Sequence, residues 1–327
     1  MMKNYPLVSV IIPTYNSSSY IKNTLKKLEQ QSYCNFEIVV VNDGSKDNTL
    51  EILEQEAASN QKLVVINKVN GGVSSARNAG IKAAKGEFIS FLDDDDQYDP
   101  AFLDKMYARH LETGANAIYC GLHRYQGRDT GTYKSIDSNF AEGLILLDFL
   151  NKKVKFHVGG IFLKREYVEE IGLYFDERLR LGEDLLFIYK LLTLCHVSSV
   201  PSYMYTHMFR EDSLMNSKRT LNHYQHESYA HGLIYQAMEE IYQGEERHKV
   251  LQMLSEKMFH HKVRYMWKTL LYGDFSLLKQ LVAENRNEFS EPANIKTLDT
   301  KSRKKIKILK SDNILVWKVV RLINRKP

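Results

Sequence analysis

Four consecutive aspartates, Asp93, Asp94, Asp95 and Asp96, directly follow the short apolar stretch 88–92. That stretch is typical of a buried strand. Four adjacent carboxylates repel one another strongly at neutral pH, and a fold tolerates them most easily where a cation binds. Carboxylate oxygens suit a hard divalent ion such as Mg2+ or Mn2+, often shared with a substrate phosphate. A solvated acidic turn is the alternative that the residues leave open.

Three further positions carry groups suited to chemistry. Asp43 follows a second apolar stretch and could bind a base or a ribose, or could close a simple Asx-turn. Arg77, near the start of a predicted helix, could bridge two phosphate oxygens or form a surface ion pair. Glu183 and Asp184 begin another helix. Two neighbouring carboxylates tend to split their pKa values, which suits a general base, although helix capping would explain one of them.

The elements that must position these groups follow a regular order. Apolar runs predict strands at 7–12, 36–41, 63–66 and 88–92. Segments that begin with polar capping residues predict helices at about 20–31, 49–59 and 74–85. We expect Pro13 to stop the first strand. Continuous apolar strands joined by helices indicate a parallel sheet covered on both faces. Ligands bind beyond the carboxyl ends of such strands, where polar clusters follow the first, second and fourth strands.

The rest of the chain is less regular. We predict strands at 117–120, 156–164 and 197–205, helices at 142–150, 166–171 and 185–194, a polar loop at 127–137, and helices from about residue 221 onward. The 327 residues allow one large α/β domain with an appendage, or two domains. The three cysteines have no C-x-x-C spacing, which argues against a zinc site or a disulfide framework and fits a reducing cytosol. Phosphate-loop, dinucleotide-binding, zinc-helix and serine-elbow motifs are all absent.

The C-terminal part carries the positive charge. A basic run at 301–307 precedes the apolar segment 314–323, which contains Trp317 and is too short to span a bilayer. A helix lying on an anionic membrane surface would have this composition. A helix packed on the domain, after a solvated charged run, fits equally well. We expect no nucleic-acid partner, because no base-stacking motif accompanies the basic residues.

Taken together, these segments resemble glycosyltransferase family 2, whose members have the GT-A fold. The resemblance covers roughly the first 215 residues and is carried by five ordered blocks: VSVIIPTYN (8–16), EIVVVNDGSKDNT (37–49), NGGVSSARNAG (70–80), KGEFISFLDDDD (85–96), and IGLYFDE with LGEDLLF (171–187). It implies a Rossmann-like α/β fold, a mostly parallel sheet with helices on both faces, over residues 1–217. Residues 1–100 would form the nucleotide-binding half and 101–217 the acceptor half. Residues 218–327 would form a helical region with a basic amphipathic tail.

The resemblance also implies residue roles. The nucleotide-binding residues would be Pro13, Thr14, Tyr15, Asp43, Arg77, Asp93 and Asp94, with Asp43 on the base and Arg77 near the diphosphate. Asp93 and Asp95 would be the D-x-D pair that binds Mn2+ or Mg2+, Asp95 directly. Asp96 would support them from behind. Asp184 would be the general base, with Glu183 beside it.

One stretch departs from the family pattern. Relatives often carry a Tyr-Arg pair after the base, whereas this chain has Tyr205, Thr206 and His207. His207 could be a third metal ligand or an ordinary loop histidine. Arg210, a little further on, is predicted to contact the diphosphate.

The implied activity is inverting transfer of a sugar, a hexose or N-acetylhexosamine, from a nucleotide-sugar donor, a UDP-sugar being expected. The acceptor would be a hydroxyl of a cell-surface glycan or of a lipid-linked oligosaccharide. We expect the protein in the cytoplasm, with peripheral contact at the inner face of the cell membrane through residues 301–323. A non-catalytic nucleotide-sugar binding module is the alternative function.

Overall fold

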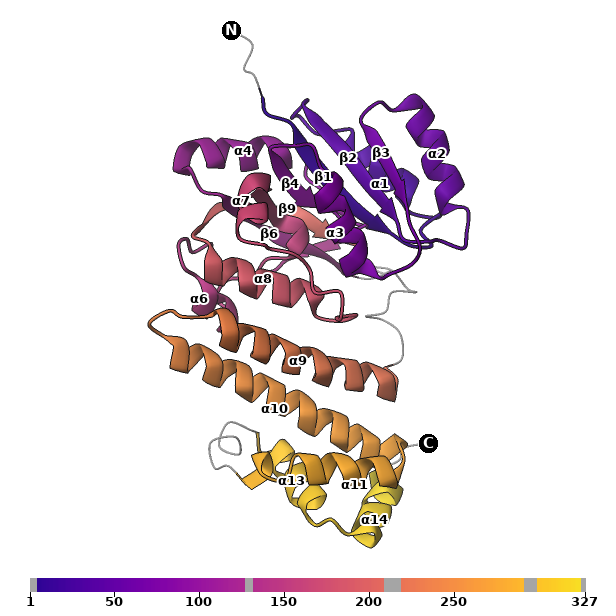
Figure 1. Ribbon diagram of the computed structural model, residues 1–327, viewed down its shortest axis with the longest axis vertical. Coiled ribbons are helices and arrows are strands. Elements are labelled where there is room, and N and C mark those ends of the chain that lie inside the picture. The colour runs from indigo at the N-terminus through magenta and orange to yellow at the C-terminus, as the bar shows by residue number, and fades with distance from the viewer. Residues whose placement is uncertain (1–4, 127–131, 209–218, 291–298, 325–327) are drawn as a thin grey trace. The chain divides into compact units, whose positions relative to one another are not determined.

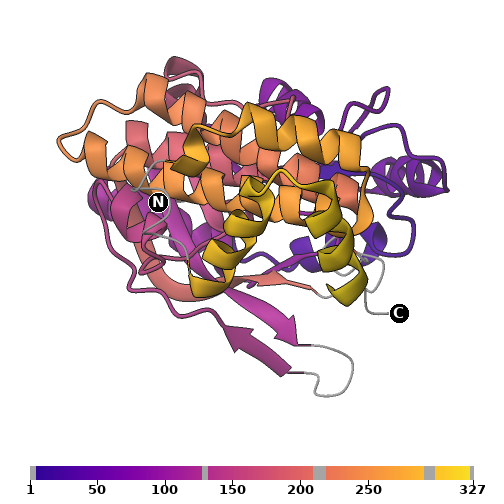
Figure 2. The ribbon, with the colours of Figure 1, turned by 90° about the horizontal axis from the view of Figure 1, so that it is seen from below.

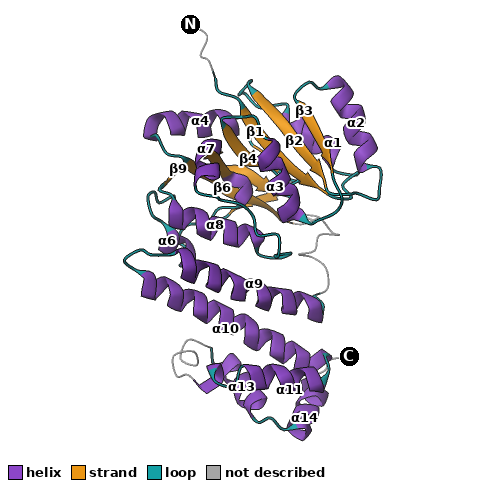
Figure 3. Cartoon of the chain, viewed as in Figure 1, coloured by secondary structure: helices purple, strands orange, loops and turns teal. Residues whose placement is uncertain are grey.

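The computed structural model describes residues 5–126, 132–208, 219–290 and 299–324 (Figure 1). The chain divides into two compact units, Met1–Asn216 and Ser217–Pro327. The first unit combines a sheet with helices, and the second is helical (Figure 3). Among the described residues, no helix is both long enough and apolar enough to cross a bilayer. Arg210 lies outside the described residues, so its predicted diphosphate contact stays a prediction.

The first unit is built on one mixed sheet. Its described strands run in the order β3-β2-β1-β4-β8-β6-β9-β5, and β7 pairs with β6. The strands are β1 (Val8–Thr14), β2 (Phe36–Asn42), β3 (Leu63–Asn67), β4 (Phe88–Phe91), β5 (Gln97–Tyr98), β6 (Ala117–Gln126), β7 (Thr132–Ser135), β8 (Ile161–Lys164) and β9 (Val197–His207). The first four are mutually parallel, as predicted. Beyond β4 the sheet is mixed, because β8 runs antiparallel to both β4 and β6.

Three sequence predictions for this sheet were wrong in detail. The first strand continues past Pro13 to Thr14. The strand can contain Pro13 because its pairing with β4 ends at Ile11. On the side of β4, no hydrogen bond from the backbone nitrogen of residue 13 is therefore required. Part of the expected loop at 127–137 forms β7, whose exposed side chains leave no apolar pattern. The predicted strand at 156–164 begins only at Ile161, because Val158–Gly160 forms a 3-10 turn.

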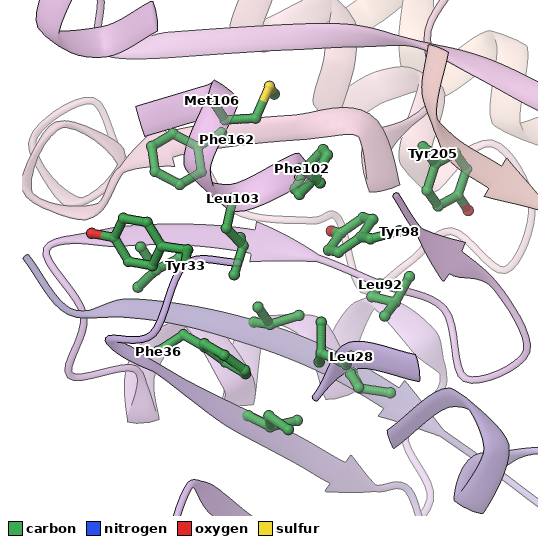
Figure 4. Packing of buried hydrophobic residues seen from close by; sticks show 14 of the residues in the cluster. Leu28, Tyr33, Phe36, Leu92, Tyr98, Phe102, Leu103, Met106, Phe162 and Tyr205 are labelled. Atoms are coloured by element: carbon green, nitrogen blue, oxygen red, sulfur yellow. The ribbon is translucent and has the colours of Figure 1, made fainter. Parts of the chain in front are cut away.

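Helices cover both faces of this sheet. They are α1 (Ile21–Leu28), α2 (Thr49–Ser59), α3 (Val73–Ala83), α4 (Phe102–Thr113), α6 (Leu146–Leu150), α7 (Arg165–Glu170) and α8 (Glu183–Leu194). One face packs against α1 and α4: Leu28, Phe102, Leu103 and Met106 are buried in one core with Leu92 (Figure 4).

The opposite face carries α3 and α8. Successive residues of a strand point to opposite faces, so Ile11 and Phe91 lie on this side. A Cβ at Gly80 of α3 would lie 2.3 Å from the Ile11 side chain, which is the reason this helix can approach β1 so closely. Phe187 of α8 meets Phe91 edge to face, with ring centroids 5.6 Å apart. Both helices therefore begin at the rim where the parallel strands end.

The second unit consists of α9 (Leu221–Ile241), α10 (Arg247–Tyr272), α11 (Phe275–Glu284), the turn Glu288–Ser290, α13 (Thr300–Lys310) and α14 (Ile314–Asn324). Figure 2 shows the yellow helices α13 and α14 joined end to end by a short turn. The core of this unit contains Phe259, Met266, Leu278, Ile306 and Trp317. Trp317 is fully buried, so one side of the C-terminal helix packs on its own unit.

Candidate active site

Arg77 on α3 joins two acidic segments that are far apart in the sequence. Its guanidinium donates to Asp93, with 2.7 Å between Nη2 and Oδ1, and to Glu183, with 3.3 Å between Nη1 and Oε1. The Arg77 side chain is only 4% exposed, and its guanidinium lies over the ring of Phe175. The fold thus brings the acidic run after β4 and the acidic start of α8 to one buried cation.

Burial and charge act in opposite directions on these three groups. Burial alone would lower the pKa of Arg77, but Asp93 and Glu183 together raise it above its usual range. Burial would raise the pKa of Asp93, but the Arg77 guanidinium lowers it below its ordinary value. Glu183 differs: burial and the adjacent Asp184 carboxylate raise its pKa despite Arg77. Asp93 is therefore an anion at neutral pH, and Glu183 holds its proton more tightly than an exposed glutamate.

The acidic run alternates between partly exposed and buried side chains. Asp93 and Asp95 are partly exposed, whereas Asp94 and Asp96 are buried. Asp94 accepts hydrogen bonds from the hydroxyls of Thr14, at 2.7 Å, and Ser17. Its backbone oxygen accepts another from Thr24 at 2.8 Å. Asp94 therefore ties the loop after β4 to β1 and α1, and its predicted nucleotide contact stays a prediction.

Asp96 is buried completely and supports the end of β9. Its carboxylate accepts from the Tyr205 hydroxyl and from the backbone N–H of Met208 at 2.7 Å. It also lies 3.3 Å from Nδ1 of His207. This hydrogen bond to Asp96 is the main reason that the pKa of His207 is raised. Asp96 therefore fixes the orientation of the His207 ring.

The residues present are chemically suited to a divalent ion. With Nδ1 of His207 directed at Asp96, Nε2 is the nitrogen left for a ligand, which is how carboxylates support metal-binding histidines. Asp93 and Asp95 are near enough to contribute to the raised pKa of His207. However, the described part of the chain holds no group of three or more such side chains able to bind an ion by themselves. An ion here would therefore need substrate oxygens as further ligands, as Mg2+ and Mn2+ commonly do.

Asp43 organises the loop that leads into α3. Its carboxylate accepts from the N–H groups of Gly71 and Gly72, at 2.9 and 2.7 Å, and from Nζ of Lys68 at 2.7 Å. Gly72 has a φ of 90°, which favours glycine at this position. These bonds come from residues far along the chain and do not form the Asx-turn considered from the sequence, and the contact of Asp43 with a base remains a prediction. Tyr15, just after β1, is 46% exposed, and its place in a nucleotide pocket stays a prediction.

His157 is a residue of this region that the sequence interpretation missed. Its Nε2 lies 3.7 Å from Oδ2 of Asp184. The N–H of Gly159 donates to its Nδ1 at 3.2 Å, so the proton of the neutral ring is placed on Nε2, facing Asp184. The ring stacks on Tyr205, with centroids 5.1 Å apart. The only sequence signal was a histidine followed closely by two glycines within an apolar stretch.

Asp184 itself sits at the first turn of α8, where the helix dipole favours a carboxylate. Its Oδ1 accepts from the N–H of Leu185 at 2.7 Å. Oδ2 faces His157, and the side chain is 35% exposed. Asp184 is thus held in one orientation yet remains accessible, as a proton acceptor must be.

A mixed α/β sheet with carboxylates beyond its parallel strands has the architecture of GT-A glycosyltransferases. Residues 9–172 match the family model described as "Glycosyl transferase family 2". The chain belongs to this family, as its sequence blocks predicted.

Curated relatives are similar to this chain over part of their length. The "Uncharacterized glycosyltransferase EpsJ" of Bacillus subtilis (strain 168) is 34% identical over 187 residues, which is 55% of this chain and 54% of that protein. The "Minor teichoic acid biosynthesis protein GgaA" of the same organism is 29% identical over 199 residues, 57% of this chain and 43% of that protein. The chain therefore spans about half the length of these relatives.

Solved structures confirm the fold. S. aureus TarS 1–349 in complex with UDP-GlcNAc has a TM-score of 0.69 at 24% identity, covering 96% of this chain and 90% of that one. The mannosyltransferase PcManGT from Pyrobaculum calidifontis, in complex with GDP-Man and Mn2+, has a TM-score of 0.55 at 16% identity, covering 99% and 89%. At these identities the likeness establishes the architecture and no more.

Proposed function

We propose that this protein is an inverting glycosyltransferase that uses a UDP-sugar as donor. The observation that carries the proposal is the meeting of Asp93, Glu183 and Asp184 around Arg77 at the end of the parallel strands. Two separate acidic segments converge at the rim where ligands of such sheets bind. If each segment were only a surface turn, the two segments would not need to meet.

The donor side is assigned to the loop ends of β1, β2 and β4. Pro13, Thr14 and Tyr15 would line the nucleotide pocket, and Asp43 would receive the base. Asp95, with Asp93 and His207, would hold Mn2+ or Mg2+ against the diphosphate. When bound, such an ion supplies positive charge that stabilises the departing diphosphate. Arg77 keeps Asp93 ionised for this purpose, since it lowers the pKa of that carboxylate.

The acceptor side is assigned to α8. Asp184 would take the proton of the attacking hydroxyl through its partly exposed carboxylate. The Nε2 of His157 faces the same carboxylate at 3.7 Å and would approach it more closely when the site is occupied. Attack from the side opposite the leaving group gives inversion at the anomeric carbon. One base suffices, and no covalent sugar–enzyme intermediate is needed.

We further propose a cell-surface polysaccharide as the acceptor class. One relative is named for minor teichoic acid biosynthesis, and a similar structure holds UDP-GlcNAc. These names favour transfer of a hexose or N-acetylhexosamine to a growing glycan or lipid-linked acceptor. Such acceptors are assembled at the inner face of the cell membrane, where we place the protein.

The test is a donor screen that measures UDP or GDP release with and without Mn2+. We expect release from a UDP-sugar that depends on the metal and is lost in Asp95→Ala and Asp184→Asn. Asp104→Asn, a substitution in the first turn of α4 and outside the site, is the matched control and should keep full activity. Full activity in either site variant would refute its assigned role. Binding of UDP with no turnover of any donor would instead favour the non-catalytic binding module.

A further inference from the structure

Helix α14 is attached to the helical unit through one side. The indole N–H of Trp317 donates to the backbone oxygen of Ile308 at 3.0 Å. Arg321, one turn later, donates to the backbone oxygens of Leu270 at 2.6 Å and Gly273 at 2.8 Å. Leu270 lies in the last turn of α10 and Gly273 directly follows the helix, where backbone carbonyls lack intrahelical partners. The side of α14 that carries Trp317 and Arg321 thus packs against its own unit.

The other side of α14 is apolar and exposed. Leu315, Val319, Leu322 and Ile323 are 72%, 54%, 78% and 77% exposed. Their spacings of three and four residues place them on one face of the helix, opposite Trp317. We call these four residues the α14 apolar face. Single exposed apolar side chains are ordinary, but four adjacent ones mark a surface that binds something.

Charge identifies the kind of partner. Within 300–324 there are eight basic residues and one acidic residue, Asp312. The basic residues are Lys301, Arg303, Lys304, Lys305, Lys307, Lys310, Lys318 and Arg321. Lys318 is exposed and borders the α14 apolar face, one turn from both Leu315 and Leu322. A second copy of this chain would bring two strongly basic segments together, which is unfavourable.

We propose that the α14 apolar face docks on the surface of an anionic lipid bilayer. Leu315, Val319, Leu322 and Ile323 would enter the boundary between headgroups and acyl chains, and Lys318 would reach the lipid phosphates along its aliphatic stem. The exposed basic residues of α13 would add attraction to the negative leaflet. The sequence interpretation counted Trp317 among the features of a membrane-surface helix, whereas its side chain faces the protein core. The inference extends the proposed location at the membrane but does not depend on the donor chemistry.

The test is co-sedimentation of the full chain with vesicles of phosphatidylcholine alone and of phosphatidylcholine with about 30% phosphatidylglycerol. We expect binding to the anionic vesicles only. Leu322→Glu should weaken that binding at least tenfold, because it places a carboxylate in the docking face. The matched control is Leu111→Glu on α4, since Leu111 is exposed to a similar degree, 62%. It should bind as the unchanged protein does.

Two further measurements make the outcome decisive. Both variants should melt at the temperature of the unchanged protein, since both leucine side chains are mostly exposed. If Leu322→Glu binds anionic vesicles as well as the control does, the proposal is wrong. If light scattering shows a dimer that Leu322→Glu dissociates, a second copy covers the face and the proposal is also overturned. UDP release measured without lipid, with a water-soluble acceptor, reports on the proposed catalytic function separately.

Discussion

Replacing Arg77 with methionine tests whether the buried ion pairs hold the site together. Methionine fills much of the same volume, so packing on Phe175 is largely kept. The change leaves the carboxylates of Asp93 and Glu183 without their cation, while their side chains remain only 26% and 13% exposed. Removing one partner from a buried ion pair costs about 3–5 kcal/mol, because the remaining charge stays buried.

The expected loss is large enough to measure by calorimetry. The unit that contains Arg77 spans 216 residues, and for that size a loss of 1 kcal/mol lowers the melting temperature by about 2–4 °C. We therefore expect its transition to fall by roughly 6–20 °C at neutral pH. Trp267 and Trp317 are the two tryptophans of the chain, and both lie in the helical unit. Tryptophan fluorescence therefore follows the unfolding of the helical unit. The calorimetric transition that it does not follow belongs to the unit that contains Arg77.

Lys22→Met is the matched control in the same unit. Lys22 is 74% exposed and pairs at 2.8 Å with Glu56, which is 27% exposed. Exposed pairs of this kind contribute about 0–1 kcal/mol, so the control should melt within a few degrees of the unchanged protein. Equal effects of the two substitutions would show that burial around Arg77 does not matter, and the reasoning would fail.

The pH dependence gives a second check on the same substitution. In the unchanged protein the lowered pKa of Asp93 contributes stability above the ordinary pKa of aspartate, and that stability is lost as pH falls through the lowered value. The raised pKa of Glu183 acts in the opposite sense and costs stability once pH exceeds the ordinary glutamate value. Without Arg77 both carboxylates should have raised pKa values. The stability difference should therefore be largest at neutral pH and should shrink as acid protonates them.

Two further predictions concern His231 and Gly159. The rings of His231 and His261 stack on each other, and burial lowers their pKa values to about 3 and about 4. The stability that the neutral rings contribute is complete above pH 6.5, the ordinary pKa of histidine, and is lost progressively as the pH falls below that value. We expect the helical unit to lose about 1–3 kcal/mol between pH 7 and 5 in urea unfolding followed by tryptophan fluorescence; an unchanged slope in His231→Phe would contradict this. A Cβ at Gly159 would lie 2.3 Å from the Tyr205 ring, so Gly159→Ala should cost about 1–3 kcal/mol through overpacking. Gly232→Ala, where nothing lies within 4 Å of the added Cβ, should cost nothing, and an equal loss in both would refute the contact.

The parallel half of the sheet could be predicted because its strands are continuous apolar runs. β1, β2, β3 and β4 lie within two residues of their predicted bounds. The sequence interpretation includes no helix at Phe102–Thr113, although α4 buries Phe102, Leu103 and Met106 there. Phe102, Leu103 and Met106 have helical spacing, so the signal was present in the sequence and the interpretation overlooked it. β7 was missed for a different reason, since its side chains are mostly exposed and leave no apolar pattern.

Individual acidic residues of the site could be named from the sequence, but their partners could not. Arg77 and Glu183 are 106 positions apart, and no local pattern predicts that they meet. The sequence interpretation offered a surface ion pair as one role for Arg77, whereas the pairing is buried. His157 was missed because its role depends on stacking against Tyr205 from a distant strand. Tertiary packing decides these contacts, and a single sequence does not contain that information in readable form.

The alternation along residues 93–96 affects how this run can be aligned with related sequences. A slip of one position exchanges aspartate for aspartate, so it costs nothing in identity. In the folded chain the same slip would equate a carboxylate that faces Arg77 with one held by Thr14. The hydroxyls of Thr14 and Tyr205 therefore mark the correct frame, because each bonds to only one particular member of the run. Relatives that keep those two hydroxyls can be aligned here from their hydrogen bonds, where sequence identity alone does not distinguish one register from the next.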